Sequence, residues 1–302
     1  MNLLLGFIAQ LLHIALIAAT APSLAGLLRW LRARLSGSVG PPVLQPWWDL
    51  LRLLRKQPVL AESATSVTSH APLACAAATA VAGCLIPSFA LGMLFAPFAD
   101  LLLVFGLLFA ARCSLALAAG DVGNTLGGIG ASRVMLVGCL VEPALLLVAM
   151  VAALLAGSLN LDLIVAMQQE SDWQIGILLA LIALLLVGFV DATRREPLAE
   201  ELAGVDLALI DLSEAVRLLL WFNLIGAMFL PFGMAPMGSS LFAWVIGMAA
   251  WLGRTVLFAV VLAVARAVVG RVCLTQSAQA LGAAALLGLL AAALLVAQTG
   301  AA

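Results

Sequence analysis

Eight long apolar runs constrain this chain more than any other feature of its sequence. Each run approaches the ~20 residues that a helix needs to cross the hydrocarbon core of a bilayer. The runs fall at about residues 2–28, 72–92, 98–119, 133–157, 174–191, 217–235, 240–266 and 279–298. They are continuous and rich in Leu and Ala, which favours helices over β-barrel strands. We therefore expect an all-α polytopic membrane protein with about eight transmembrane helices in a single integral membrane domain, residues 1–302.

The composition excludes a soluble globular domain. A soluble chain of 302 residues needs a polar surface, but 65% of these residues are hydrophobic and only 10% are charged. The mean hydropathy is +1.21. The first run is too long for a signal peptide, has no basic residue before it and is followed by cations from Arg29 onward, which predicts a retained helix.

The positions of the basic residues predict the orientation of the chain. Every odd-numbered loop between the runs is basic, whereas the even-numbered loops contain no Lys or Arg. The positive-inside rule therefore places loops one, three, five and seven in the cytoplasm of a bacterial inner membrane, with both termini outside. The basic residues of these loops are Arg29, Arg32, Arg34, Arg52, Arg55, Lys56, Arg133, Arg194, Arg195 and Arg271.

The first loop contains the segment GPPVLQPWWDLLRLLRKQ, residues 40–57. Residues 45–57 have helical periodicity, which places an apolar face of Trp47, Leu50, Leu51 and Leu54 opposite a polar face of Asp49, Arg52 and Lys56. About 13 residues are too few to span a bilayer, so the pattern predicts an amphipathic helix at the membrane surface. Such a helix could be a plain interfacial anchor or a docking site for a cytoplasmic partner.

An acidic cytoplasmic loop is predicted over residues 191–216, where seven of the fifteen carboxylates lie. Clustered carboxylates raise one another's pKa values and can hold protons near neutral pH, as a proton entry site requires. A solvated acidic loop with no such role is the alternative. The seven carboxylates are Asp191, Glu196, Glu200, Glu201, Asp206, Asp211 and Glu214.

Five ionisable residues fall inside apolar runs: Asp100, Arg112, Glu142, Arg254 and Arg266. Glu142 has apolar neighbours and precedes Pro143, and a carboxylate at such a depth costs at least ~2.5 kcal/mol unless it is paired, protonated or hydrated. We expect a proton or coupling role for Glu142, with a structural ion pair as the alternative. Arg254 lies near the middle of its run, so we expect a carboxylate partner for it. Arg112 and Arg266 lie nearer the cytoplasmic ends, where snorkelling is the simpler expectation.

The sequence contains no arrangement that supports catalysis or cofactor binding by this chain alone. The five cysteines show no CxxC spacing, and two histidines far apart in the pattern suggest no haem pair. The glycine-rich run GDVGNTLGGIGASR, residues 120–133, is no P-loop, because neither a preceding strand nor a following Gly-Lys-Ser/Thr is present. It permits tight turns and close helix approach. We expect no metal in this chain and no nucleic-acid binding, and any chemistry must belong to a partner.

Three segments resemble one family of membrane subunits: residues 40–57, DVGNTLGGIGASRVMLVGCLVEPALL at residues 121–146, and FVDATRREPLAEELAGVDLALID at residues 189–211. A weaker similarity covers WLGRTVLFAVVLAVARAVVGR, residues 251–271. Together they resemble subunit 1 (the H subunit) of respiratory complex I and the membrane-anchor subunit of group 4 [NiFe] hydrogenases and formate hydrogenlyase. Residues 121–146 are closest to the hydrogenase branch. The third segment departs from the family around Glu196 and Pro197, and its Glu-Tyr-Ser-Gly element is replaced at residues 211–214.

The resemblance implies a membrane-anchor and coupling subunit of an energy-converting oxidoreductase. Such a subunit docks a cytoplasmic arm of hydrogenase-type large and small subunits, whose [4Fe-4S] clusters and NiFe centre lie outside this chain. It also contacts antiporter-like membrane subunits and links electron flow to proton translocation. The alternatives are the quinone-site subunit of a complex I-type NADH dehydrogenase and a purely structural scaffold.

The resemblance and the charge pattern together give two sets of candidate site residues. Those expected to couple protons are Glu142, Asp191, Glu196, Glu200, Glu201, Asp206, Asp211, Arg112 and Arg254. Those expected to dock the cytoplasmic arm are Gln45, Asp49, Arg52, Arg55, Lys56, Arg133, Arg194 and Arg195.

Overall fold

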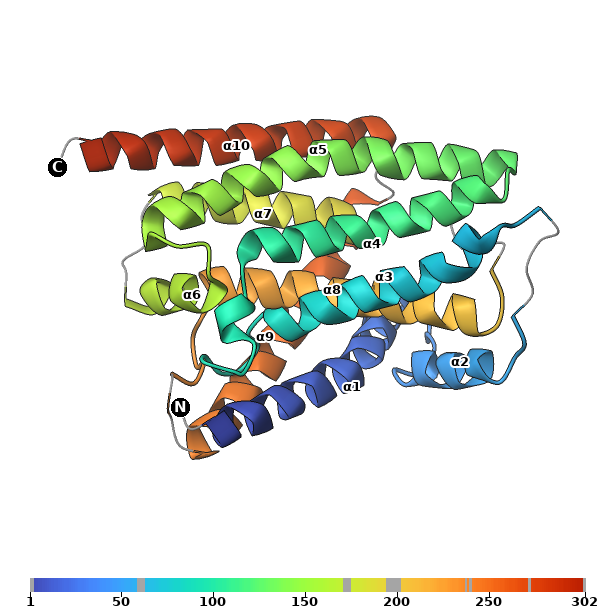
Figure 1. Cartoon of the computed structure of the whole chain (residues 1–302), viewed down its shortest axis with the longest axis horizontal. Helices are drawn as coiled ribbons and strands as arrows, with labels where there is room; N and C mark the ends of the chain where they lie inside the picture. The colour runs from blue at the N-terminus through green and yellow to red at the C-terminus, as the bar shows by residue number, and fades with distance from the viewer. Residues whose placement is uncertain are drawn as a thin grey trace.

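A computed structural model describes residues 3–58, 63–170, 175–193, 202–236, 238, 241–270 and 273–300 (Figure 1). The described residues form α-helices and one short 3₁₀ helix, with no strand among them, so the expected all-α class is confirmed. The helices are α1 (Leu3–Leu35), α2 (Gln45–Leu54), α3 (Ser66–Leu85), η1 (Ala96–Phe98), α4 (Leu101–Asp121), α5 (Thr125–Ala156), α6 (Leu161–Glu170), α7 (Ile175–Thr193), α8 (Val205–Phe229), α9 (Leu241–Val269) and α10 (Leu274–Gly300).

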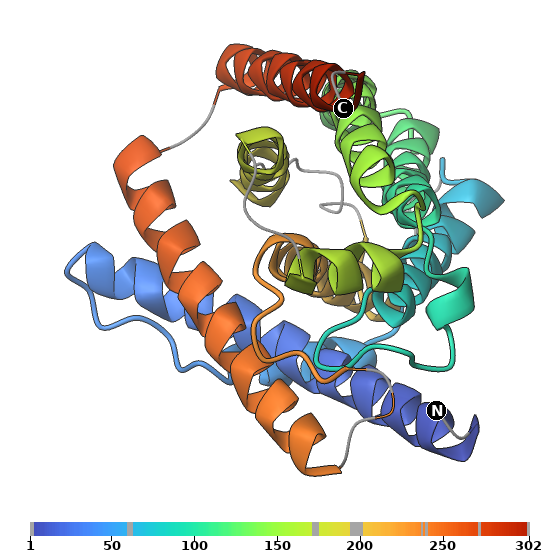
Figure 2. The ribbon, with the colours of Figure 1, turned by 90° about the vertical axis from the view of Figure 1, so that its left-hand side faces the viewer.

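Seven of the described helices are long and apolar enough to cross a membrane, where the sequence predicted about eight spans. These seven are α1, α3, α4, α5, α7, α9 and α10. The sixth expected span, residues 217–235, begins within α8 and extends past its end; α8 is not among the seven and has Asp206, Asp211, Glu214 and Arg217 in its first half. Every residue of α8 from 219 to 229 is buried, because other helices surround it (Figure 2).

The long helices are held together by close packing around α8. Helices α5, α7 and α10 pack on one another along one side, with α4 against α5, whereas α1 and α9 cross on the other side (Figure 2). Small residues permit this approach, as membrane helices require. A Cβ atom added at Gly176 of α7 would lie 3.0 Å from Leu295 of α10. The start of α1 and the end of α10 lie at the same end of the molecule, away from α2 (Figure 1).

The acidic loop predicted over residues 191–216 is mostly helical, which corrects that expectation. Helix α7 continues to Thr193 and α8 begins at Val205, so Asp191 belongs to the last turn of α7. The acids of α8 lie between apolar residues at helical spacing, including the buried Ala208 and Ile210, which explains why this stretch is a helix. Residues 194–201, and with them Arg194, Arg195, Glu196, Glu200 and Glu201, lie outside the described residues.

Helix α2 is amphipathic, but its faces differ from the predicted ones. The helix ends at Leu54 rather than at residue 57, and it packs on α1 and α8. Pro46 and Leu53 are buried on that side, whereas Leu51 and Leu54, which were predicted to share the apolar face, are exposed. The connection before α2 follows α1 so closely that a Cβ atom at Gly26 would lie 1.8 Å from the carbonyl oxygen of Val43.

Candidate functional site

A buried ion cluster joins α4, α7 and α8. The guanidinium Nη2 of Arg112 lies 3.0 Å from Oδ1 of Asp191, and Nε of Arg217 lies 3.5 Å from Oδ2 of the same carboxylate. The indole Nε1–H of Trp221 donates a hydrogen bond of 2.6 Å to that Oδ2. The side chains of Arg112 and Asp191 are only 7% and 11% exposed. Two cations from different helices therefore share one buried carboxylate.

Local helix geometry explains why these residues meet. Arg217 and Trp221 are four residues apart on α8, so both side chains lie on one face of that helix. Asp191 occupies the last turn of α7, beside that face. Breaking a buried ion pair by removing one partner typically costs about 3–5 kcal/mol, because the remaining charge stays buried and uncompensated. The cluster therefore ties three helices together through charges that strongly influence one another.

The structure places two predicted residues, Arg112 and Asp191, in this cluster and adds one that the sequence argument did not select. Arg112 was expected to snorkel toward the membrane surface, but its guanidinium forms an ion pair with Asp191. Arg217 was taken only as the start of an apolar run. Its spacing to Trp221 is the signal in the sequence that could have identified it, once α8 is known to begin at Val205.

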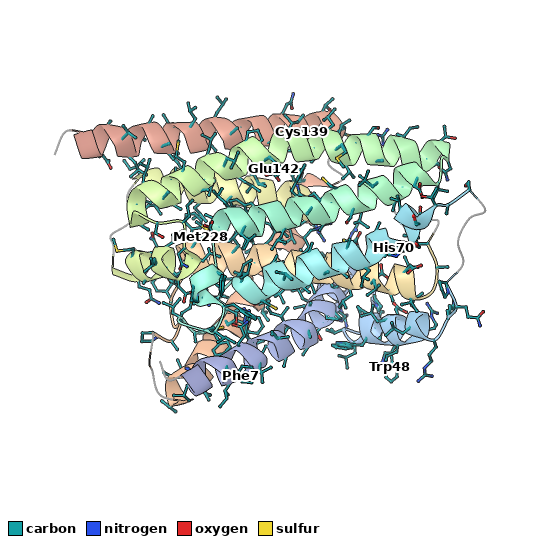
Figure 3. The ribbon with its side chains drawn as sticks, in the orientation of Figure 1. Phe7, Trp48, His70, Cys139, Glu142 and Met228 are labelled. Atoms are coloured by element: carbon teal, nitrogen blue, oxygen red, sulfur yellow. The ribbon has the colours of Figure 1, made fainter. Side chains whose placement is uncertain are left out.

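Glu142 lies on α5, next to this cluster. Its carboxylate is half-buried, and Arg112 is the cation with which it interacts electrostatically. Among the described residues, no hydrogen bond or ion pair closer than 4.0 Å reaches Glu142. Figure 3 shows it on the same stretch of α5 as the exposed Cys139. Carboxylates and cations therefore alternate from Glu142 through Arg112 and Asp191 to Arg217.

Arg254 is not part of the cluster and has no carboxylate partner in the described part of the chain, so that expectation was wrong. Its guanidinium donates to three backbone carbonyls, those of Gly226 (3.1 Å), Leu230 (2.5 Å) and Ser88 (3.0 Å). The last carbonyls of a helix have no intrahelical partner and carry the negative end of the helix dipole, so they can bind a cation without a carboxylate. Arg254 therefore caps the C-terminal end of α8.

The other ionisable residues of the apolar runs also lie at helix ends. Asp100 caps α4 by accepting a 2.8 Å hydrogen bond from the amide of Leu102. Arg266 does not extend alone toward the membrane surface, because its Nη2 donates to the carbonyl of Ala192 in the last turn of α7. Backbone groups at helix ends thus pair with charged side chains for which no partner could be recognised in the sequence.

The acids of α8 precede the cluster along the helix. Asp206 lies in the first turn of α8, and Asp211 lies nearly three turns before Trp221. Glu214, which was not a predicted coupling residue, is within electrostatic range of Arg217. Helix α8 thus carries both the acidic residues of its first turns and one cation of the ion cluster, Arg217.

The predicted docking residues divide into two groups. Gln45 donates to Asp49 (3.2 Å), and Asp49 lies 3.7 Å from Arg29 of α1, so these two side chains tie α2 to α1. Four predicted docking residues are exposed. They are Arg52, Arg55, Lys56 and Arg133.

The glycine-rich connection between α4 and α5 makes close contacts, as predicted. Asp121 accepts hydrogen bonds from the backbone and side chains of Thr65 and Thr68 at the start of α3. Asn124 caps α5 by accepting from the amide of Gly127 (2.7 Å). A Cβ atom at Gly127 would lie 2.5 Å from the carbonyl oxygen of Ala119. This connection therefore fixes the relative positions of α3, α4 and α5.

Two further observations concern titratable groups outside the long helices and possible metal ligands. Asp162, in the short helix α6, is buried, and burial raises the pKa of its carboxyl group, although a 2.6 Å hydrogen bond from the amide of Gly92 opposes this shift. Within the described ranges, no group of three or more His, Cys, Asp or Glu side chains is placed to hold a metal ion.

Comparisons with known proteins agree with the fold. The sequence matches the family model described as NADH dehydrogenase over residues 8–298. Hydrogenase-4 component C of Escherichia coli (strain K12) is 32% identical over 233 residues, which cover 71% of this chain and 72% of that protein. Formate hydrogenlyase subunit 4 of the same organism is 35% identical over 152 residues, about half of each chain.

A solved structure has the same fold. It comes from the membrane-bound sulfane sulfur reductase, an archaeal respiratory membrane complex, and superposes with a TM-score of 0.79 over 95% of this chain and 99% of that chain, at 23% identity. The family match covers nearly the whole sequence, and the first relative is matched over more than two thirds of its length. The chain therefore belongs to the NADH dehydrogenase family, the family of complex I subunit 1, and is a multi-pass membrane protein.

Proposed function

We propose that this chain is the membrane-anchor and coupling subunit of an energy-converting oxidoreductase similar to group 4 hydrogenases and formate hydrogenlyase. It docks a cytoplasmic electron-transfer arm and links electron flow to proton translocation. Family membership and similarity to Hydrogenase-4 component C and Formate hydrogenlyase subunit 4 support this proposal. The [4Fe-4S] clusters and the NiFe centre would lie in the cytoplasmic large and small subunits, and antiporter-like subunits would adjoin it in the membrane.

The buried cluster of Arg112, Asp191 and Arg217 carries the coupling part of the proposal. Two unit charges 3.0 Å apart, the separation of Arg112 and Asp191, attract by about 5 kcal/mol at an effective dielectric constant near 20. A change in the protonation or position of one residue of the cluster therefore changes the electrostatic energy of the others. Glu142, half-buried beside Arg112, is the group that can exchange a proton while changing the charge balance of the cluster.

The exposed basic residues at the α2 end of the molecule support docking there. Arg55 and Lys56 follow the last turn of α2, and Arg133 lies in the first turns of α5. With Arg194 and Arg195, which lie outside the described residues, they would face the cytoplasmic arm. In this proposed orientation, which follows the positive-inside rule, both termini would lie on the outer side of the membrane.

Replacing Glu142 by Gln tests the coupling role. We expect Glu142→Gln to abolish coupled proton movement while the assembled complex retains its subunits, because the amide keeps the size of the side chain but cannot release a proton. Asp162→Asn is the matched control, since it changes a buried carboxyl of α6 that is not part of the cluster. Proton uptake by everted vesicles and subunit content after purification are the two measurements. Unchanged proton movement in Glu142→Gln would exclude this residue from coupling.

A passive scaffold is the second candidate function. The observation that favours it is that the Arg112–Asp191–Arg217 cluster joins α4, α7 and α8 and would hold them together without moving protons. A scaffold predicts that substitutions in the cluster lower the amount of assembled complex and leave the protons moved per electron unchanged in the complex that remains.

A further inference from the structure

The corner where α1 meets α2 has a large excess of positive charge that the coupling cluster does not use. Residues 29–58 contain six cations and a single carboxylate, Asp49. That carboxylate is already shared by Arg29 at 3.7 Å and Arg52 at 3.6 Å. The guanidinium of Arg34 lies over the ring of Trp30, 5.3 Å from its centre, and remains exposed. The corner therefore attracts anions.

A row of exposed apolar side chains lies beside these cations. On α2, Trp48 is 67% exposed, and Leu51 and Leu54 are exposed as well. Pro46 and Leu53 are buried on the opposite side, against the protein. Figure 3 shows Trp48 at the outer edge of the molecule, on the side of α2 turned away from α8. Helix α2 thus has a second apolar side, and an exposed apolar surface of this kind marks a contact with lipid or with another apolar surface.

The contacts of α2 with α1 fix its depth in the membrane. The indole Nε1–H of Trp47 donates to the hydroxyl of Ser23 (3.0 Å), and Asp49 pairs with Arg29. Ser23 lies in the apolar part of α1, whereas Arg29 is the first cation after it. Helix α2 is therefore level with the boundary between hydrocarbon and headgroups, where tryptophan is favoured.

We propose that the α1–α2 corner binds the headgroups of anionic phospholipids. Arg32 and Arg52 would contact the phosphates, while Trp48 and Leu51 would cover the upper acyl chains, as in amphipathic helices that bind anionic membranes. A soluble partner is a poorer fit for this side. Trp48 lies on the side of α2 turned away from the bundle (Figure 3), whereas a cytoplasmic arm would reach the end of α2, where Arg55 and Lys56 follow.

Native mass spectrometry of the purified complex tests this proposal with equimolar phosphatidylglycerol and phosphatidylcholine as probes. We expect the wild type to retain phosphatidylglycerol preferentially. The double variant Arg32→Gln/Arg52→Gln should lower the ratio of retained phosphatidylglycerol to phosphatidylcholine about 25-fold, or about fivefold for each cation removed. Arg32→Lys/Arg52→Lys keeps the charges and should keep most of the preference. Arg133→Gln removes an exposed cation from α5 and serves as the matched control.

The role of the apolar row and the role of charge are tested separately. Trp48→Ala should lower the retention of both lipids without changing their ratio. In the wild type, the preference should fall as ammonium acetate rises from about 50 mM to about 500 mM, because salt screens exposed charges. A preference that survives both salt and the double Gln substitution would overturn the proposal. So would a double variant that keeps its lipid preference but loses the cytoplasmic subunits, since the corner would then be a protein dock.

Discussion

Asp191 is the residue on which the buried charges of this protein converge. Its carboxylate accepts from Trp221 and pairs with Arg112 and Arg217, so the contacts of α7 with α4 and with α8 both depend on one ionised group. Such a group remains stable in a bundle only while both arginines compensate it. Each change in the charge of Glu142 alters the field at Arg112 and thereby the pairing of Asp191. This shared carboxylate is the physical basis of the proposed coupling.

Arg254 has a structural role at the residue scale. We predict that Arg254→Met lowers the stability of the purified protein by about 2–4 kcal/mol, because the carbonyls of Leu230 and Ser88 lose their side-chain donor and that of Gly226 keeps only the amide of Leu230. This loss corresponds to a melting temperature lower by roughly 5–10 °C in detergent. Arg133→Met, at an exposed position, should change the melting temperature little. Equal melting temperatures for the two variants would contradict the role assigned to Arg254.

The sequence allowed some of the candidate site to be predicted, but not its pairings. Glu142 and Arg112 stand out because ionisable residues are rare in apolar runs. The prediction of a carboxylate partner for Arg254 was wrong, because hydrogen bonds from a side chain to backbone carbonyls at a helix end cannot be recognised in a sequence. Arg217 was missed because a cation at the edge of an apolar run has the pattern of a membrane-surface anchor.

At the scale of elements, α8 shows where apolar-run reasoning fails. Its first half carries Asp206, Asp211, Glu214 and Arg217, so a hydropathy criterion assigns these residues to a loop. The helix nevertheless continues through them because its apolar residues keep helical spacing and pack inside the bundle. The helices of the other seven runs were predictable because lipid requires continuous apolar sequence. The exposed side of α2 was not predictable, because periodicity alone does not show which neighbouring helix packs on each face.

Gly204 controls the junction between the start of α8 and the segment that follows α2. It has a φ of +64°, and a Cβ atom there would lie 2.6 Å from the carbonyl oxygen of Gln57. We predict that Gly204→Ala costs at least about 1–2 kcal/mol, because both the left-handed backbone and the close contact are lost. The displaced segment should also be cleaved faster by trypsin after Arg55 and Lys56.

The matched control for this prediction is Gly253→Ala. Gly253 lies within α9, and a Cβ atom there would meet no atom within 4 Å. Alanine in a helix is favoured over glycine by up to about 1 kcal/mol, so this variant should be as stable as the wild type or slightly more stable. If Gly204→Ala matched it in both stability and trypsin cleavage, the close junction would not constrain α8.

At the scale of the whole molecule, the helices place three features in order along the bundle. The exposed cations of α2 lie at one end, and the cluster around Asp191 is buried beside α4 and α8. Arg254 binds the carbonyls of Gly226 and Leu230, which lie about 14 and 20 Å along the helix axis from Arg217. The fold thus separates the exposed cations proposed to dock a partner from the buried residues proposed to respond to it. Sequence predicted the fold class, whereas this ordering required the packing of helices distant in the sequence.

The number of protons moved per electron by the assembled complex tests the central claim most directly. The variant for this measurement is Arg112→Gln/Asp191→Asn, because removing one cation and one carboxylate together leaves the net charge of the buried cluster unchanged. Reconstituted vesicles would report electron transfer from the donor and acidification together. We predict that electron transfer continues while proton movement falls to the level of uncoupled vesicles. A wild-type ratio of protons to electrons in this variant would contradict the proposed coupling.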